Sequence, residues 1–365
     1  MLPTNRFPLR LGLLWAALIT LALPLCAEDT GAAPEPATPV QELVFFTWAD
    51  FIDPGVVADF EREYGVRVRE VHFENDEVRD RVMAETGGAG FDLLLVDGTG
   101  VEAYRRRGWI APIDAAAAPN LAHIAPRWLP AGAAGRAAAV PYVWGTLGIA
   151  YRRDLLGREL DSWMDLLRPE PDLAGRILMS SDSLDLVGMV LKALGHSMNS
   201  TDPQALAAAR DLLLEQAPAV HRYGALAVDE GSELLGPDVV AGMTFNGDAA
   251  ALMEHNTSVV YVVPREGGAL WVDFLAVAAA SEQKALATAF IDYLNRPEVA
   301  ARNAQGIYYA TPNRAAEALL PAAFRADPLV YPDADTLARC EPYRRLTPEA
   351  QRTRAQIVSQ VVDGG

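Results

Sequence analysis

The amino-acid sequence predicts an α/β protein with two lobes. Strand-like and helix-like segments alternate along the chain in two sets, and an apolar, aromatic segment over residues 141–151 lies between them. In the first set, strand, helix, strand, helix and strand follow one another within about 55 residues, which predicts βαβ units and a parallel sheet. About 338 residues follow position 27, enough for two domains with their own hydrophobic cores.

The N-terminus predicts a secretory signal over residues 1–27. Arg6 and Arg10 precede an apolar run of about 15 residues that ends at Cys26 and Ala27, and such a run is short for a membrane span. Cleavage after Ala27 predicts a soluble periplasmic product, and the alternative is a lipid anchor through Cys26. The stretch over residues 28–41 is rich in proline and alanine and predicts a flexible leader.

The first set of elements can be followed from its apolar patterns and breakers. Residues 43–46 and 92–96 are short apolar runs typical of buried strands, and residues 66–71 alternate as a strand. Helices are predicted over residues 54–64, between Pro54 and Gly65, and over residues 75–85, which precede Gly87 and Gly88.

The second set follows the apolar segment at residues 141–151. We expect elements at residues 162–167, 176–179, 184–194 and 203–214, strands at residues 239–245, 259–263 and 270–277, and an amphipathic helix at residues 282–293.

Composition excludes several classes of function. The formal charge is −17, or −19 without the two signal arginines, which argues against a nucleic-acid partner and is compatible with cationic ligands. Cys340 is the only cysteine after the signal, and the five histidines have no metal-binding spacing, so we expect no disulfide, metal or cofactor. No nucleophile motif, P-loop or GxGxxG is present, so we do not expect an enzyme, and an exported hydrolase remains a minor alternative.

Asp273 is the most informative single residue. It lies inside the strand predicted over residues 270–277, where an unpaired carboxylate costs several kcal/mol. Strand alternation places Trp271 on the same face, and an indole beside a carboxylate suits an alkylammonium group. The alternative is an aspartate paired with a basic residue of the protein.

Other acids and rings have both a structural and a binding interpretation. Asp182 and Asp185 either converge on one amine or serve as helix cap and first-turn acid, and Asp248 is either a ligand contact or an N-cap. Trp48, Phe51 and Asp97 follow or end predicted strands, where open α/β sheets present binding residues, although the two rings also suit a core.

Several segments resemble the periplasmic spermidine/putrescine-binding proteins, the substrate-capture subunits of polyamine ABC transporters. The resemblance covers residues 42–345. It rests on FTWADFI at residues 46–52, PYVWG at 141–145, SWMDL at 162–166, GMTFNG at 242–247, PREGGALWVD at 264–273, YATPN at 309–313 and YPDA at 331–334.

This resemblance implies the type II periplasmic binding fold, in which two lobes are joined by crossing hinge strands. We expect one lobe at residues 42–147 and 272–317 and the other at residues 148–271 and 318–365. It implies amine-binding carboxylates and an aromatic box, at Trp48, Asp50, Phe51, Asp97, Asp182, Asp185, Phe245, Asp248, Trp271, Asp273 and Tyr309.

Some positions differ from the spermidine-binding members of that family. Thr99 and Gly100 stand where those members carry tyrosines, Asp185 replaces a glutamate, and Tyr343 falls near a glutamine that helps to bind one amine. The ligand class is therefore implied, but the ligand length is not.

The implied partners are a small polyamine and an inner-membrane ABC permease, with the protein itself a monomer. The alternatives are a polyamine sensor that docks on a membrane signalling receptor, or a binder of another cationic amine such as agmatine.

Overall fold

The structure, a computed structural model, describes residues 40–129 and 136–362. The predicted signal and all but the end of the predicted leader lie outside the described residues. None of the helices in the described ranges has both the length and the apolar character that a membrane span requires.

The first set of elements follows the predicted order. It consists of β1 (Glu42–Thr47), α1 (Pro54–Tyr64), β2 (Arg67–His72), α2 (Asp76–Thr86), β3 (Leu93–Asp97), α3 (Gly100–Arg107), β4 (Ile110–Ala111), β5 (Ile113–Asp114), the 3-10 helices Pro119–His123 and Pro126–Trp128, and β6 (Arg136–Ala137). The five elements predicted before residue 97 are all present, each displaced by at most one residue.

Side chains at the helix ends explain why these bounds are readable. Asp53 caps α1 by accepting a hydrogen bond from the Val56 amide at 2.9 Å, and Gly65 ends the helix in a left-handed conformation with φ of 65°. Asn75 caps α2 in the same way through the Val78 amide. The bounds of these two helices are therefore set by residues at their own ends.

The second set begins at the long apolar segment and continues to the end of the described residues. It consists of β7 (Val140–Arg152), α4 (Met164–Leu167), β8 (Ile177–Met179), α5 (Ser183–Ala193), α6 (Pro203–Gln216), the 3-10 helix Ala217–Ala219, β9 (Val220–Tyr223), the 3-10 helix Glu233–Leu235, β10 (Ala241–Phe245), α7 (Asn246–His255), β11 (Val259–Val262), β12 (Ala269–Ala278), α8 (Lys284–Leu294), α9 (Pro297–Ile307), α10 (Arg314–Leu319), α11 (Ala322–Arg325), α12 (Ala334–Arg339), β13 (Glu341–Pro342) and α13 (Pro348–Val362). The α/β class predicted from the sequence is confirmed.

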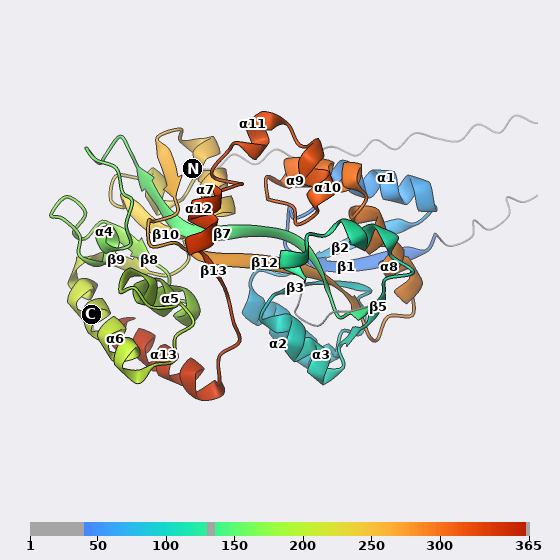
Figure 1. The fold of residues 1–365 in the computed structure, drawn as a ribbon, viewed down its shortest axis with the longest axis horizontal. Helices are drawn as coiled ribbons and strands as arrows, with labels where there is room; N and C mark the ends of the chain where they lie inside the picture. Colours follow the sequence, from blue (N-terminus) through green and yellow to red (C-terminus); the bar gives the residue numbers. More distant parts are fainter. Residues whose placement is uncertain (1–39, 130–135, 363–365) are drawn as a thin grey trace, which may run out of the picture. The chain divides into compact units, whose positions relative to one another are not determined.

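One large sheet connects both sets, with strand order β2-β1-β3-β12-β7-β10-β8-β9. The outer groups, β2-β1-β3 and β10-β8-β9, are internally parallel, as the βαβ pattern predicts. The central strands β12 and β7 are antiparallel to each other and to their neighbours β3 and β10, so the sheet is mixed rather than wholly parallel. In Figure 1, β7 and β12 run from one group of elements to the other.

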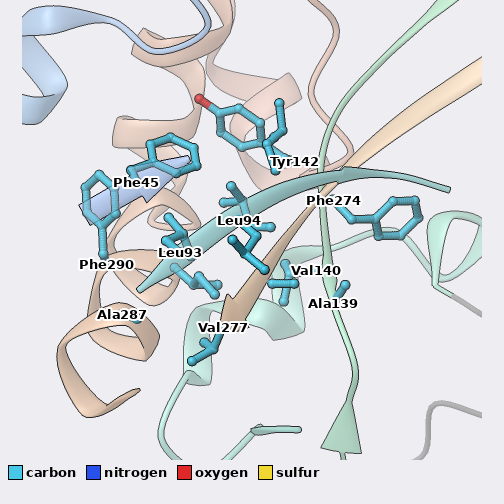
Figure 2. Close-up of a cluster of buried hydrophobic side chains, with 14 of the residues drawn as sticks. Phe45, Leu93, Leu94, Ala139, Val140, Tyr142, Phe274, Val277, Ala287 and Phe290 are labelled. Carbon is cyan, nitrogen blue, oxygen red and sulfur yellow. The ribbon is translucent and has the colours of Figure 1, made fainter. Parts of the chain in front are cut away.

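Two separate hydrophobic cores lie along this sheet. Phe45, Leu94, Val140 and Phe290 belong to the first core, which gathers side chains from β1, β3, α8 and the start of β7, as Figure 2 shows. The second core is built from α5, α6, β8, β10 and the end of β7, from Leu147 onward.

Strand β7 therefore changes core along its length. Its first half pairs with β12 and its second half with β10 and β11, so a single strand crosses from one core to the other. This supports the predicted pair of lobes. The predicted limits of the lobes remain a proposal.

Candidate ligand-binding site

The sheet brings together five predicted residues from three distant segments. Trp48 and Phe51 lie in the loop after β1, and Asp97 is the last residue of the parallel strand β3. Because β12 runs antiparallel beside β3, Trp271 and Asp273 reach the same edge from the opposite direction. Ligands of open α/β sheets bind outside this edge, at the carboxyl ends of parallel strands.

Asp273 has a carboxylate without a partner. It lies directly opposite Asp97 in the register of β12 and β3, so both side chains are on one face of the sheet. No hydrogen bond or ion pair reaches the Asp273 carboxylate from residues 40–129 and 136–362. Burial raises its pKa well above the ordinary value, the charges of Asp97 and Asp76 raise it further, and Arg79 opposes the rise. The alternative of a direct ion pair with the protein is not what the structure shows.

Aromatic rings line the region beside this carboxylate. The rings of Trp271 and Tyr309 meet edge to face at 5.3 Å, and the ring of Tyr309 lies 5.2 Å from that of Phe51. Trp48 packs against Phe73 at 4.5 Å. Together they give an apolar wall of the kind that accepts methylene groups. The buried indole N–H of Trp271 has no acceptor among the described residues, and an ammonium, which only donates, does not supply one.

Two glycines allow these rings to lie close to the backbone. A side chain at Gly145, on β7, would overlap Asn246 and the Trp271 ring. A side chain at Gly247, at the start of α7, would overlap the hydroxyl end of Tyr309. Both positions fall in segments that carry the family resemblance, PYVWG and GMTFNG, and their lack of a side chain has a direct steric reason.

Asp182 and Asp185 lie at the N-terminus of α5. Asp182 is exposed and caps the helix, accepting from the amides of Leu184 at 2.7 Å and Asp185 at 3.0 Å, so its structural interpretation is realised. Asp185 is buried and accepts from the Tyr343 hydroxyl at 2.5 Å. Burial, together with the charge of Asp182, raises the pKa of Asp185 to about 7.

Asp248 is not an N-cap, and that alternative is wrong. It is the third residue of α7, whose N-cap position is held by Phe245. Its carboxylate accepts from the Thr244 hydroxyl at 3.2 Å, and burial raises its pKa to about 6. Its charge also acts on Tyr309, which places it near the aromatic wall.

Asp50 and Phe245 are the two remaining predicted residues. Asp50 is exposed, and its backbone is left-handed, with φ of 56°, a conformation that aspartate tolerates better than most residues. Phe245 is partly buried and packs against the second core.

Asp97, in contrast, is fully engaged by the protein. Its Oδ2 pairs with Arg79 Nη2 at 2.6 Å, and its Oδ1 accepts from the Thr99 amide and hydroxyl and from the Gly100 amide. Burial alone would raise the pKa of Asp97, but Arg79 and these hydrogen bonds outweigh it and hold the pKa below its ordinary value.

Sequence reasoning missed Arg79, Asp76 and the contact made by Tyr343. Arg79 and Asp76 share a turn of α2 and pair at 2.8 Å. Their spacing is visible in the sequence, but the sequence does not show that this face of the helix points toward the site. Asp76 acts electrostatically on Asp182 and Asp185 as well as on Asp273, so it lies between the two groups of acids. Desolvation by the surrounding protein raises the pKa of Asp76 to about 6, although 57% of its side chain is exposed. Arg79 opposes this rise, and the charges of the neighbouring acids add to it.

Two surface cavities lie elsewhere, near the C-terminal end of α5. They measure about 530 and 350 Å³ and share His196 and Ser197. No predicted site residue lines either of them.

Comparisons with known proteins identify the family to which the chain is similar. The model of a family described as bacterial extracellular solute-binding protein matches residues 55–332. Over 301 residues the chain is 31% identical to a spermidine/putrescine-binding periplasmic protein of Escherichia coli (strain K12), covering 82% of this chain and 85% of that protein. It is also 31% identical over 322 residues to a norspermidine sensor of Vibrio cholerae, covering 88% of each.

A solved structure extends the agreement to three dimensions. The spermidine/putrescine ABC transporter substrate-binding protein PotD from Streptococcus pneumoniae matches with a TM-score of 0.80 and 28% identity, covering 88% of this chain and 98% of that chain. The predicted two-lobed binding-protein fold with crossing strands is confirmed, as is the resemblance drawn from the sequence.

Proposed function

Because this chain belongs to the family of bacterial extracellular solute-binding proteins, we propose that it captures a polyamine of the putrescine and spermidine class and delivers it to the permease of an ABC transporter. The family consists of solute-binding proteins rather than enzymes. The names of the Escherichia coli and Streptococcus pneumoniae relatives support the ligand class and the transporter partner.

The unpartnered carboxylate of Asp273 carries this proposal. Asp273 is partly buried, and a carboxylate that is removed from water without a counter-charge is destabilised; a ligand ammonium removes that cost on binding. The adjacent rings of Trp271 and Tyr309 supply the apolar surface and cation–π faces that an alkylammonium chain requires. Each methylene buried against them contributes about 0.8 kcal/mol.

The remaining acids suit the other ammonium group. Asp185 and Asp182 at the start of α5, and Asp248 at the start of α7, come from the half of the sheet opposite to that of Asp273. We therefore place one ammonium at Asp273 and another among these three, with methylenes between. Trp48, Asp50, Phe51, Phe245, Trp271 and Tyr309 complete the proposed ligand contacts.

Acids from both halves make closure depend on the ligand. Without a cation between them, bringing Asp273 and Asp76 toward Asp182 and Asp185 is opposed by like-charge repulsion. We propose that the lobes, at about the limits expected from the sequence, rotate around β7 and β12 on binding.

The proposal also covers the chain's state and surroundings. We expect a monomer without catalytic activity, with no nucleic-acid partner, acting in the periplasm after removal of the signal. A lipid anchor through Cys26 is the alternative form of the same extracytoplasmic protein.

Isothermal titration tests the function directly. The purified wild-type protein is titrated with putrescine, cadaverine, spermidine, spermine and agmatine, with lysine and γ-aminobutyrate as controls. We expect dissociation constants in the submicromolar to micromolar range for at least one di- or polyamine. An absence of heat and of any thermal shift with all five amines would contradict the proposal.

A sensor role is the second candidate, because one relative is named a norspermidine sensor. In that role the liganded form docks on a membrane signalling receptor. Pull-down from membranes with the liganded protein distinguishes the two: a permease is expected for transport and a receptor for sensing.

A further inference from the structure

Arg79 is a buried arginine held among the acids of the proposed ligand slot. Its side chain is 2% exposed, and it pairs with Asp97 at 2.6 Å and with Asp76 at 2.8 Å. Its Nε and Nη2 also donate to Asp80, and its Nε donates to Tyr104. Every nitrogen of the guanidinium therefore has an acceptor, which fixes the position of this positive charge.

The two facing aspartates, Asp97 and Asp273, therefore differ in their hydrogen-bond partners. A carboxylate offers about four acceptor positions. At Asp97, Oδ1 receives two donors of Thr99 and the Gly100 amide, and Oδ2 receives Arg79, while the Asp273 carboxylate, directly across the strands, receives no donor from the described residues. Asp97 therefore has a counter-charge within the protein, and Asp273 has none among the described residues.

We propose that Arg79 is a specificity-determining residue: with Asp97 committed to it, this end of the slot accepts a single ammonium and selects against ligands with aminopropyl groups. The inference rests on the proposed function. An aminopropyl end carries two ammonium groups three methylenes apart. With the first at Asp273, the second meets the fixed guanidinium, and the facing carboxylate of Asp97 is already paired with that guanidinium.

Linear diamines avoid this conflict. In putrescine or cadaverine, the second ammonium lies at the far end of four or five methylenes, so it leaves the Asp273 end and passes along the rings of Trp271 and Tyr309. Spermine and norspermidine carry aminopropyl groups at both ends and cannot be reversed to escape Arg79. The structure therefore favours a diamine over these two ligands.

Titration of the full-length protein with putrescine, cadaverine, norspermidine and spermine tests the inference. We expect the wild type to bind the better diamine at least tenfold more tightly than either aminopropyl ligand. In Arg79→Gln, Asp97 loses its counter-charge and gains an unfilled position, so we expect this ratio to fall below threefold. Arg81→Gln is the matched control, since Arg81 is an exposed residue of the same helix without an ion pair in the described ranges, and its ratio is expected to equal that of the wild type.

A second variant guards against misfolding. If thermal unfolding shows that Arg79→Gln does not fold, the double variant Arg79→Gln/Asp97→Asn removes the cation and the excess negative charge together. The amide oxygen that Asp97→Asn introduces still accepts from the backbone amides at the start of α3. With the cation gone, the ratio is expected to fall at least threefold below that of the wild type.

The outcomes separate this inference from the function beneath it. Wild-type protein that binds norspermidine or spermine as tightly as the diamines overturns the role of Arg79 while the polyamine function stands. An unchanged ratio in a folded Arg79 variant does the same. Wild-type protein that binds none of the four ligands, nor spermidine, overturns the proposed function and the inference with it.

Discussion

Two groups of acids meet in the proposed slot, and they differ in whether the protein supplies a counter-charge. On the β3 and α2 side, Asp76, Asp80 and Asp97 surround Arg79. On the α5 side, no cation pairs with Asp182 or Asp185 within residues 40–129 and 136–362. Instead, Asp185 accepts a hydrogen bond from a tyrosine hydroxyl, and Asp182 accepts from the backbone amides at the N-terminus of α5.

The consequence appears in the protonation of the two groups. Although Asp97 is partly buried, Arg79 and three further donors keep its pKa below the ordinary value, so it stays charged and bound. Burial raises the pKa of Asp185 to about 7, because hydroxyl donors alone do not offset it. Burial therefore does not identify a ligand carboxylate by itself. A carboxylate that is buried and lacks a protein cation is the one for which a ligand ammonium contributes most.

The sharpest test of this comparison neutralises, one at a time, the two aspartates that face each other across β3 and β12. Asp273→Asn is expected to weaken binding of the best amine at least tenfold, about 1.4 kcal/mol, because the ammonium loses its only carboxylate at that end. The same change removes a partly buried carboxylate that has no partner among the described residues, so the unliganded protein is expected to melt at a higher temperature. Titration and thermal unfolding measure both effects.

Asp97→Asn is the matched control, because Asp97 lies directly opposite Asp273 on the neighbouring strand. It breaks the Arg79 ion pair, so we expect a lower melting temperature and a change in diamine affinity of less than threefold. If Asp97→Asn weakens diamine binding as much as Asp273→Asn, the division between structural and ligand carboxylates is wrong.

A pH titration of affinity tests the α5 side. Asp185 has a pKa of about 7 in the folded protein, so between pH 6 and 8 its ionised fraction rises about tenfold. Because an ammonium requires the ionised form, we expect affinity to rise by up to about tenfold over this range, with release of a proton on binding. Asp185→Asn is expected to bind more weakly at pH 8 and to lose most of the slope.

The stability of the unliganded protein should show the opposite trend. The folded-state pKa of Asp185 lies above the ordinary value for aspartate, so the folded state holds the extra proton between about pH 4 and 7. This contribution to stability is complete below that window and is lost as the pH rises through it. The test is the difference in melting temperature between wild type and Asp185→Asn. If this difference does not change with pH from 4 to 8, the raised pKa is contradicted.

The sequence was sufficient for features that are set locally, and it failed where contacts cross the fold. Asp53, Asn75 and Gly65 mark helix ends through their own backbone, so those elements are readable to within a residue. Asp273 was identifiable because an isolated charge in an apolar strand is conspicuous.

The partners of the acids were not readable in this way. Arg79 lies 18 residues from Asp97, and Tyr343 lies 158 residues from Asp185, so no local pattern links them. The antiparallel pairing of the central strands was not predicted for the same reason, since pairing between β12 and β3 joins segments about 180 residues apart. Asp182 shows the limit most clearly: its pattern fits a cap and a ligand contact equally.

Tyr343→Phe is expected to have a smaller effect on the same side of the slot. The hydroxyl donates to Asp185 at 2.5 Å and favours its ionised form, so its loss should raise the pKa of Asp185 further. A hydrogen bond of this kind contributes about 1 kcal/mol net, which predicts an affinity loss of about fivefold at pH 7. At pH 8.5 most of the loss should disappear, and an equal loss at both pH values would show that Tyr343 acts by packing.

The smallest expected effect is that of Asp182→Asn, and it asks whether a cap is also a ligand contact. Asparagine caps a helix about as well as aspartate, so α5 should keep its stability to within about 0.5 kcal/mol. Asp202→Asn is a matched control, because Asp202 is an exposed N-cap of the neighbouring helix α6, outside the proposed slot. We expect a loss of amine affinity of about twofold for Asp182→Asn and none for Asp202→Asn, since an exposed charge near the ligand is screened by water and salt. Repeating the titration in 0.5 M salt should remove the difference between the two variants. A tenfold loss that persists in salt would instead make Asp182 a direct ligand carboxylate, equal in rank to Asp273.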